Sequence, residues 1–220
     1  MFISHAYKVI FIHIQRTGGN SIRKIFAEYD PDFIEKIPLD PSKKRFKHCY
    51  ASDLKAAVPE ELFKSYLKFG VVRNPFDRMV SWYSMFEHPE TIQTVPFAQN
   101  PELATTGLDV LLEISKYVES FEAFLQAPRD HEKGLFERFY VNQVDFISEH
   151  GQVIVDRILR FEKLPWDFEN FAREIGFAGT LPHTNESKRE TDYRSYYNDV
   201  TKEIIAQRFQ RDLDYFGYQF

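Results

Sequence analysis

Several features that mark other classes of protein are scarce in this sequence. Its 220 residues include one cysteine, Cys49, so no disulfide can form within the chain, and a reducing compartment is favoured. No apolar run approaches the roughly 20 residues that a membrane-spanning helix needs. The N-terminus has no charged leader ahead of a long apolar stretch. We therefore expect a cytoplasmic protein with no transmembrane segment.

Positive charge is also in short supply. The chain has 28 Lys and Arg against 33 Asp and Glu, and its formal net charge is -5. Non-specific binding to nucleic acids needs an excess of cationic side chains, because the phosphate backbone supplies most of the affinity. We therefore expect no nucleic-acid partner.

Apolar residues, in contrast, are plentiful. Hydrophobic residues make up 43% of the chain and aromatic residues 16%, which is enough for a substantial core. The length suits one large domain, residues 1–220. Apolar runs at 8–14 and 67–72 are each followed by a turn and a helical pattern. Buried strands that alternate with helices predict an α/β fold with a mainly parallel central sheet flanked by helices.

The rest of the chain shows weaker patterns of secondary structure. We expect the following further elements: a short helix at 53–58 capped by Ser52, a long loop at 87–107, a largely helical stretch at 108–126, one or two strands within 153–161, a helix at 166–175, a loop-like stretch at 176–195 and one amphipathic helix at 200–216.

The first turn between a strand and a helix, residues 13–21, has the composition of an anion site. Gly18 and Gly19 let backbone amides crowd around an anion, and the N-terminus of the following helix adds partial positive charge. A cation and further donors stand beside them: Arg16, Thr17, Asn20 and Ser21. The pattern predicts a phosphate or sulfate site, although an ordinary Gly-Gly turn capped by Ser or Asn would have the same composition.

The second such turn, residues 72–83, places an arginine at the end of a strand. A guanidinium there can bind a phosphate through two N–H groups, and Ser81 follows within the helix. Taken alone, this turn favours a structural interpretation, with Arg73 in a surface ion pair and Ser81 as a tolerated helix serine. Ligands of parallel α/β sheets bind beyond the carboxyl ends of the strands, where both turns lie.

Together the two turns resemble the motifs of PAPS-dependent sulfotransferases (PAPS is 3′-phosphoadenosine 5′-phosphosulfate), in particular the carbohydrate group that includes heparan sulfate 2-O-sulfotransferase and bacterial relatives. The family's first loop is typically His-x-Pro-Lys-Thr-Gly-Gly-Thr-Ser, and residues 13–21 read His-Ile-Gln-Arg-Thr-Gly-Gly-Asn-Ser. Its second element, Val-Arg-Asn-Pro-x-x-Arg-x-x-Ser-x-Tyr, is almost completely matched at 72–83. Residues 156–162 and 181–187 look like the family's second half.

The resemblance implies a three-layer P-loop-like fold, PAPS as the donor, PAP (3′-phosphoadenosine 5′-phosphate) as the product, and a carbohydrate or other hydroxyl as the acceptor. It assigns the 3′-phosphate to Arg73 and Ser81. It assigns the 5′-phosphosulfate to the first loop, namely Arg16, Thr17, Gly18, Gly19, Asn20 and Ser21.

The family also implies a catalytic base, often a histidine between the two motifs. His48 is the only histidine there, and a neutral imidazole suits proton abstraction near pH 7. Two alternatives stay open: His48 is a surface histidine of a basic loop, or an Asp or Glu side chain serves as the base. The other histidines show no convincing spacing for metal ligands, so we expect no metal.

One position departs from the family pattern. Arg16 stands where the family has a lysine that contacts the leaving oxygen, and a guanidinium effectively never loses its proton. Arg16 would therefore act catalytically through its charge alone. Two other functions stay open here: a non-catalytic module that binds PAP or another nucleotide, and a P-loop-like small-molecule kinase. The kinase is disfavoured because the Walker A spacing is missing.

Overall fold

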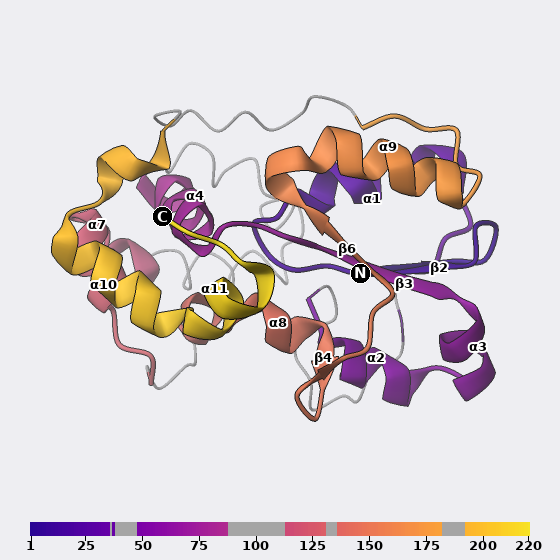
Figure 1. Cartoon of the computed structure of the whole chain (residues 1–220), viewed down its shortest axis with the longest axis horizontal. Coiled ribbons are helices and arrows are strands. Elements are labelled where there is room, and N and C mark those ends of the chain that lie inside the picture. The colour runs from indigo at the N-terminus through magenta and orange to yellow at the C-terminus, as the bar shows by residue number, and fades with distance from the viewer. Residues whose placement is uncertain (36, 38–47, 88–112, 131–135, 182–191) are drawn as a thin grey trace. The chain divides into compact units, whose positions relative to one another are not determined.

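The computed structural model describes residues 1–35, 37, 48–87, 113–130, 136–181 and 192–220 (Figure 1). The chain divides into two compact units. Unit 1 comprises Met1–Asn74 and Gln143–Glu186, and unit 2 comprises Pro75–Asn142 and Ser187–Phe220. The expectation of a single domain over residues 1–220 stays a prediction.

Unit 1 is built on a four-stranded sheet with the order β1-β2-β3-β6. The strands are β1 (Phe2–Ser4), β2 (Val9–Ile12), β3 (Leu67–Val72) and β6 (Arg157–Arg160). β2, β3 and β6 run parallel to one another, and β1 pairs with β2 in the antiparallel direction. The predicted α/β class with a mainly parallel sheet is confirmed, whereas the three-residue strand β1 was not predicted.

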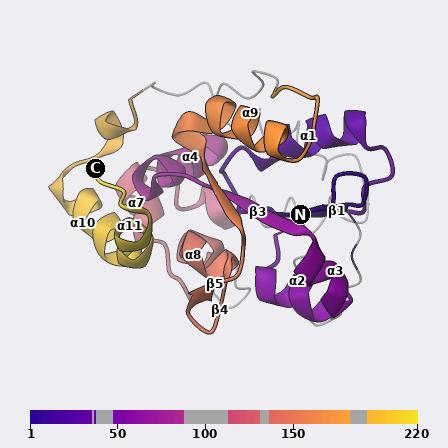
Figure 2. The same cartoon turned by 45° about the vertical axis from the view of Figure 1, so that its right-hand side comes forward.

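Helices lie on both faces of this sheet. Figures 1 and 2 show α1 (Gly19–Tyr29) and α9 (Leu164–Glu174) on one face, and α2 (Ala51–Ala57) and α3 (Glu60–Ser65) on the other. The apolar stripe of α1 faces the sheet because Ile22, Ile25 and Phe26 recur at helical spacing. The core beneath α1 and α9 is rich in phenylalanine: Phe2, Phe11, Phe26, Phe69, Phe168, Phe171 and Phe177.

The remaining short elements of unit 1 follow one another in the chain. They are α8 (Gln143–Phe146), the hairpin strands β4 (Ser148–Glu149) and β5 (Gln152–Val153), and a 3-10 turn at Phe161–Lys163. The strands predicted within 153–161 are therefore found, since β5 ends at Val153 and β6 occupies Arg157–Arg160.

The described part of unit 2 is helical and aromatic. It contains α4 (Pro75–Glu87), α7 (Phe121–Gln126), α10 (Asp199–Arg208), α11 (Gln210–Phe216) and 3-10 turns at Glu137–Phe139 and Tyr193–Tyr196. Tyr197 packs against Phe76 and Phe121, and its hydroxyl donates to the Phe76 carbonyl at 2.8 Å. Desolvation by burial, helped by nearby Asp77, raises the pKa of the Tyr197 phenol well above its usual value.

Two local predictions are wrong, and a third stretch has an internal boundary that was not predicted. Ser52 does not cap a helix, because α2 already begins at Ala51 with Tyr50 in the N-cap position. The expected helix at 200–216 is two helices, since Phe209 leaves the helical conformation between α10 and α11. The stretch predicted to be largely helical at 108–126 is described from residue 113 onward, and there it is interrupted at Ser120, which is extended and whose side chain accepts from the Ala123 amide to begin α7.

Other expectations fall partly outside the described residues. The predicted loop at 87–107 lies outside them except for residue 87, which ends α4. Residues 182–191 of the second loop-like stretch lie outside as well. Among the described residues, no helix combines the length and the apolar character needed to cross a membrane.

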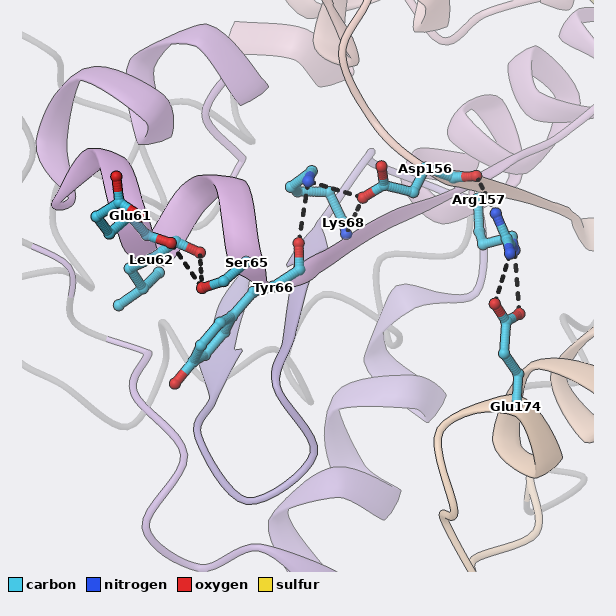
Figure 3. A network of polar contacts seen from close by, with 8 residues as sticks. All are labelled: Glu61, Leu62, Ser65, Tyr66, Lys68, Asp156, Arg157 and Glu174. Atoms are coloured by element: carbon cyan, nitrogen blue, oxygen red, sulfur yellow. Dashed lines mark hydrogen bonds and ion pairs between the residues drawn. The ribbon is translucent and has the colours of Figure 1, made fainter.

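A polar network joins β3 and β6 at the edge where these strands begin (Figure 3). The Asp156 carboxylate accepts from the Lys68 backbone amide at 2.7 Å and pairs with the Lys68 ammonium at 2.8 Å. The Lys68 side chain is 9% exposed and that of Asp156 is 42% exposed, so the pair is partly screened by water. The network holds the register of the two strands whose opposite ends carry the site described below.

We predict that Asp156→Ala lowers the free energy of unfolding by about 1–3 kcal/mol, because it leaves a buried amide and a buried ammonium without this acceptor. Chemical denaturation of the purified protein measures the change. Glu174→Ala is the matched control: it breaks the exposed ion pair with Arg157 and should cost less than about 1 kcal/mol. Equal losses of unfolding free energy in the two variants would contradict a stabilising role for the Asp156 carboxylate between β3 and β6.

Candidate functional site

Three loops leave the sheet of unit 1 at one edge. β2 ends at Ile12, β3 at Val72 and β6 at Arg160, and Val72 pairs with Arg160 in the register of the sheet. The segments that begin at Arg73 and Phe161 therefore start side by side, and the segment that begins at His13 starts two residues earlier on the neighbouring strand, because Ile12 pairs with Gly70. Because ligands of parallel sheets bind beyond the carboxyl ends of the strands, this edge is the candidate site.

The first loop curls before helix α1. Arg16 and Gly18 both have left-handed backbone, with φ of 65° and 84°. Gly18 is the N-cap of α1, and no side chain caps the helix there. Alternation of left-handed and right-handed residues turns successive amides toward one side of a loop, and the helix N-terminus adds partial positive charge. Such a loop is suited to hold an anion, and anion binding by these residues stays a prediction.

Thr17 supports the shape of this loop. Its side chain is fully buried, and its hydroxyl donates to the Ile14 carbonyl at 2.9 Å. A hydroxyl has one proton to donate. The side-chain proton of Thr17 is thus used within the loop, and a contribution of Thr17 to anion binding would come from its backbone amide.

His13 packs closely against the start of α1. A Cβ atom added to Gly19 would lie 2.3 Å from His13 Cδ2 and 2.4 Å from Nε2, far inside van der Waals contact. The His13 ring is buried and stacks on Phe11 with ring centroids 5.5 Å apart. Glycine at position 19 is therefore required by the close approach of this ring.

His48 reaches the first loop from 35 residues further along the chain. Its Nδ1 lies 2.9 Å from the backbone carbonyl oxygen of His13, and the two rings meet edge to face at 4.4 Å. A carbonyl oxygen can only accept, so Nδ1 of His48 carries a proton. In the neutral imidazole, the lone pair then lies on Nε2. The structure brings the predicted base to the predicted loop in the tautomer that a base at Nε2 requires.

Arg73 joins the second motif to the first. Its side chain is part-buried in this contact, and the residue as a whole is 4% exposed. The guanidinium Nη1 donates to the Arg16 carbonyl at 3.2 Å. Gln143 holds the backbone of Arg73 on both sides, because its Oε1 accepts from the Arg73 amide at 2.9 Å and its Nε2 donates to the Arg73 carbonyl at 2.8 Å. The two motifs that suggested phosphate binding thus meet within unit 1.

The segment after β6 completes this edge of the sheet. The Phe161 ring lies under the Arg73 guanidinium, with 3.9 Å between Cζ and the ring centroid. The Glu162 carboxylate accepts from the Asn74 amide at 2.5 Å. Gln143, Phe161 and Glu162 were not predicted as site residues. Phe161 and Glu162 lie in a stretch that resembled the family, but nothing in the sequence marked Gln143, which is 70 residues from Arg73.

The other predicted residues have different surroundings. Ser81 lies in α4 of unit 2 and is 3% exposed, and its shared role with Arg73 stays a prediction. Asn20 and Ser21 lie in the first turn of α1. Across the described ranges, no group of three or more His, Cys, Asp and Glu residues is placed to hold a metal ion.

Comparisons with known proteins agree with the two motifs. The model described as "Sulfotransferase family" matches residues 1–219 of the chain. Carbohydrate sulfotransferase 10 of Xenopus laevis is 23% identical over 248 residues, an alignment that covers 100% of this chain and 67% of the relative. No solved structure matches the chain.

We predict that Gly19→Ala lowers the free energy of unfolding by about 1–3 kcal/mol, because the new methyl group collides with the buried His13 ring. Chemical denaturation of Gly19→Ala, His13→Ala and the double variant tests the cause. The ring is absent in the double variant, so its loss should be smaller than the sum of the single losses by about 1 kcal/mol or more. Additive losses would show that the ring is not what excludes a side chain at position 19.

Proposed function

Because this chain belongs to the sulfotransferase family, we propose that it transfers a sulfuryl group from PAPS to a hydroxyl of a carbohydrate and releases PAP. The observation that carries the proposal is the contact in unit 1 between the Arg73 guanidinium and the Arg16 carbonyl. It joins two anion-binding motifs in one place, as a nucleotide with phosphates at both its 3′ and 5′ positions requires. The name of the similar carbohydrate sulfotransferase supports the class of acceptor.

The P-loop-like fold is part of this proposal. A glycine-containing loop follows strand β2 and leads into helix α1, and β2 runs parallel to β3 within the sheet. This is the strand-loop-helix arrangement in which backbone amides and a helix N-terminus hold phosphate oxygens.

The residues of the first loop fit the 5′-phosphosulfate. Amides of the curled loop and of the first turn of α1 supply N–H donors, and the Arg16 side chain supplies a permanent positive charge. Asn20 and Ser21 add polar side chains beside them. The bound donor supplies the reactive sulfuryl group. The chain itself supplies the surroundings that stabilise charge on the phosphate side of the bond that breaks.

Arg73 and Ser81 are the proposed partners of the 3′-phosphate. A guanidinium can present two parallel N–H groups to two phosphate oxygens, which gives direction as well as charge. The 3′-phosphate is the group that distinguishes PAP from AMP. A site that reads it should separate the two nucleotides by affinity.

His48 is the proposed base. The acceptor hydroxyl gives its proton to His48 Nε2, its oxygen forms a bond to sulfur, and the bond between sulfur and the 5′-phosphate oxygen breaks. The electrons of that bond go to the phosphate of PAP, where Arg16 and the loop amides stabilise the added negative charge. Such a transfer depends chiefly on alignment and charge stabilisation.

We predict that the protein binds PAP at least about 10-fold more tightly than AMP, and that Arg73→Ala removes most of this preference. Calorimetric titrations with PAP and with AMP measure this preference. A titration with ATP and magnesium provides a further comparison. Arg157→Ala is the matched control, because Arg157 is an exposed arginine paired with Glu174. Equal affinity of the unaltered protein for PAP and AMP would refute a 3′-phosphate site.

We predict that His48→Asn lowers sulfation by about 10²–10⁴-fold while the affinity for PAP stays within about 2-fold. Asparagine can still donate to the His13 carbonyl, but it has no basic nitrogen. The assay follows PAP release from PAPS with a panel of carbohydrate acceptors. His150→Asn, at an exposed turn where His150 has a φ of 51°, serves as the control. Unchanged turnover in His48→Asn would remove His48 from the mechanism. If the unaltered protein bound PAP but neither it nor the variants sulfated any acceptor, a non-catalytic module would be favoured.

A further inference from the structure

Phe161 contacts both phosphate motifs of unit 1. On one side, the Arg73 guanidinium carbon lies 3.9 Å from the centroid of the Phe161 ring. On the other side, a Cβ atom placed on Gly18 would lie 3.2 Å from Phe161 Cδ2 and 3.4 Å from Cε2. One aromatic ring therefore packs between the first loop and the arginine of the second motif.

Hydrogen bonds anchor the residues on both sides of Phe161, one through a backbone amide and one through a side-chain carboxylate. The preceding residue, Arg160, donates its amide to the Asp167 carboxylate at 2.7 Å, and the following residue, Glu162, accepts from the Asn74 amide at 2.5 Å. Hydrogen bonds to carboxylates are among the stronger ones in proteins. The ring is thus presented from a held segment rather than from a free loop.

The ring and the Arg16 carbonyl together restrict the Arg73 side chain. The guanidinium stacks with one face on Phe161 and donates Nη1 to Arg16 at 3.2 Å. An arginine side chain loses about 2 kcal/mol of rotamer entropy when it is ordered, and a site that orders it in advance spares the ligand that cost. An aromatic face is attracted to the cation without accepting a hydrogen bond in the plane of the guanidinium, so the ring orients that plane through its face alone.

From these contacts we propose that Phe161 is a positioning residue that orients Arg73 for the 3′-phosphate and so sets the preference of the site for PAP over AMP. The inference rests on the proposed function. It adds to that function a residue that touches neither phosphate and acts through the arginine that does.

The test is the ratio of the affinities for PAP and AMP, measured by calorimetric titration. Both nucleotides carry the 5′-phosphate, so a change in the packing of Phe161 on Gly18 affects both affinities alike and leaves the ratio unchanged. Loss of the aromatic face under Arg73 lowers the affinity for PAP alone, because only PAP carries the 3′-phosphate. For Phe161→Leu we expect the ratio to fall about 5-fold. Phe161→Tyr keeps the aromatic face and should stay within about 2-fold of the unaltered protein.

Two further arms separate positioning from a general loss of structure. Phe161→Met fills a similar volume without an aromatic face and should reproduce the fall seen with leucine, and thermal unfolding confirms that each variant is folded. In an Arg73→Ala background, Phe161→Leu should cause no further change in the ratio, because the residue through which Phe161 acts is gone.

An unchanged ratio in folded Phe161→Leu and Phe161→Met would overturn the inference while the proposed function stands. The same would follow if leucine at 161 lowered the ratio equally with and without Arg73. No preference for PAP in the unaltered protein would overturn the proposed function itself, and the inference with it.

Discussion

At the carboxyl edge of the sheet in unit 1, a buried guanidinium donates a hydrogen bond to a loop carbonyl. Arg73 is the residue that follows β3, and Arg16 lies in the loop between β2 and α1. The hydrogen bond between them can form only because β2 and β3 are paired in parallel. Gln143 fixes the backbone of Arg73, and Phe161 supports the face of its side chain. The candidate site is thus a consequence of strand order combined with three contacts to one arginine.

A second set of contacts ties the proposed base to the same loop. The His13 carbonyl sets the protonation of His48 Nδ1, while the His13 ring occupies the space that a side chain at Gly19 would need. One residue at the end of β2 therefore influences both the first loop and the group that would take the acceptor proton. A displacement reaction requires its base and its leaving-group site to be held in fixed relation, and under the proposed function the packing around His13 would supply that relation.

The fold was predictable where the sequence has strong local patterns. The β-branched run before Gly18 and the run ending at Val72 fit buried parallel strands, and both are present as β2 and β3. Helix boundaries were not predicted where caps decided them. Ser120 begins a helix inside a stretch with helical composition, and Phe209 separates two helices that share one apolar pattern. Periodicity alone does not reveal such breaks, because a cap depends on the backbone conformation of a single residue.

The sequence by itself determined the residue types of the candidate site: a glycine loop with a cation, an arginine at a strand end and one histidine between them, arranged as in the sulfotransferase family. Those are local features, since each depends on residue types within a few positions. Only the tertiary structure decided which atoms meet. It gave His48 its tautomer through a carbonyl 35 residues away, and it brought Gln143 to the backbone of Arg73 across 70 residues. Such contacts arise from strand pairing and side-chain packing between distant segments, and no spacing along the chain encodes them.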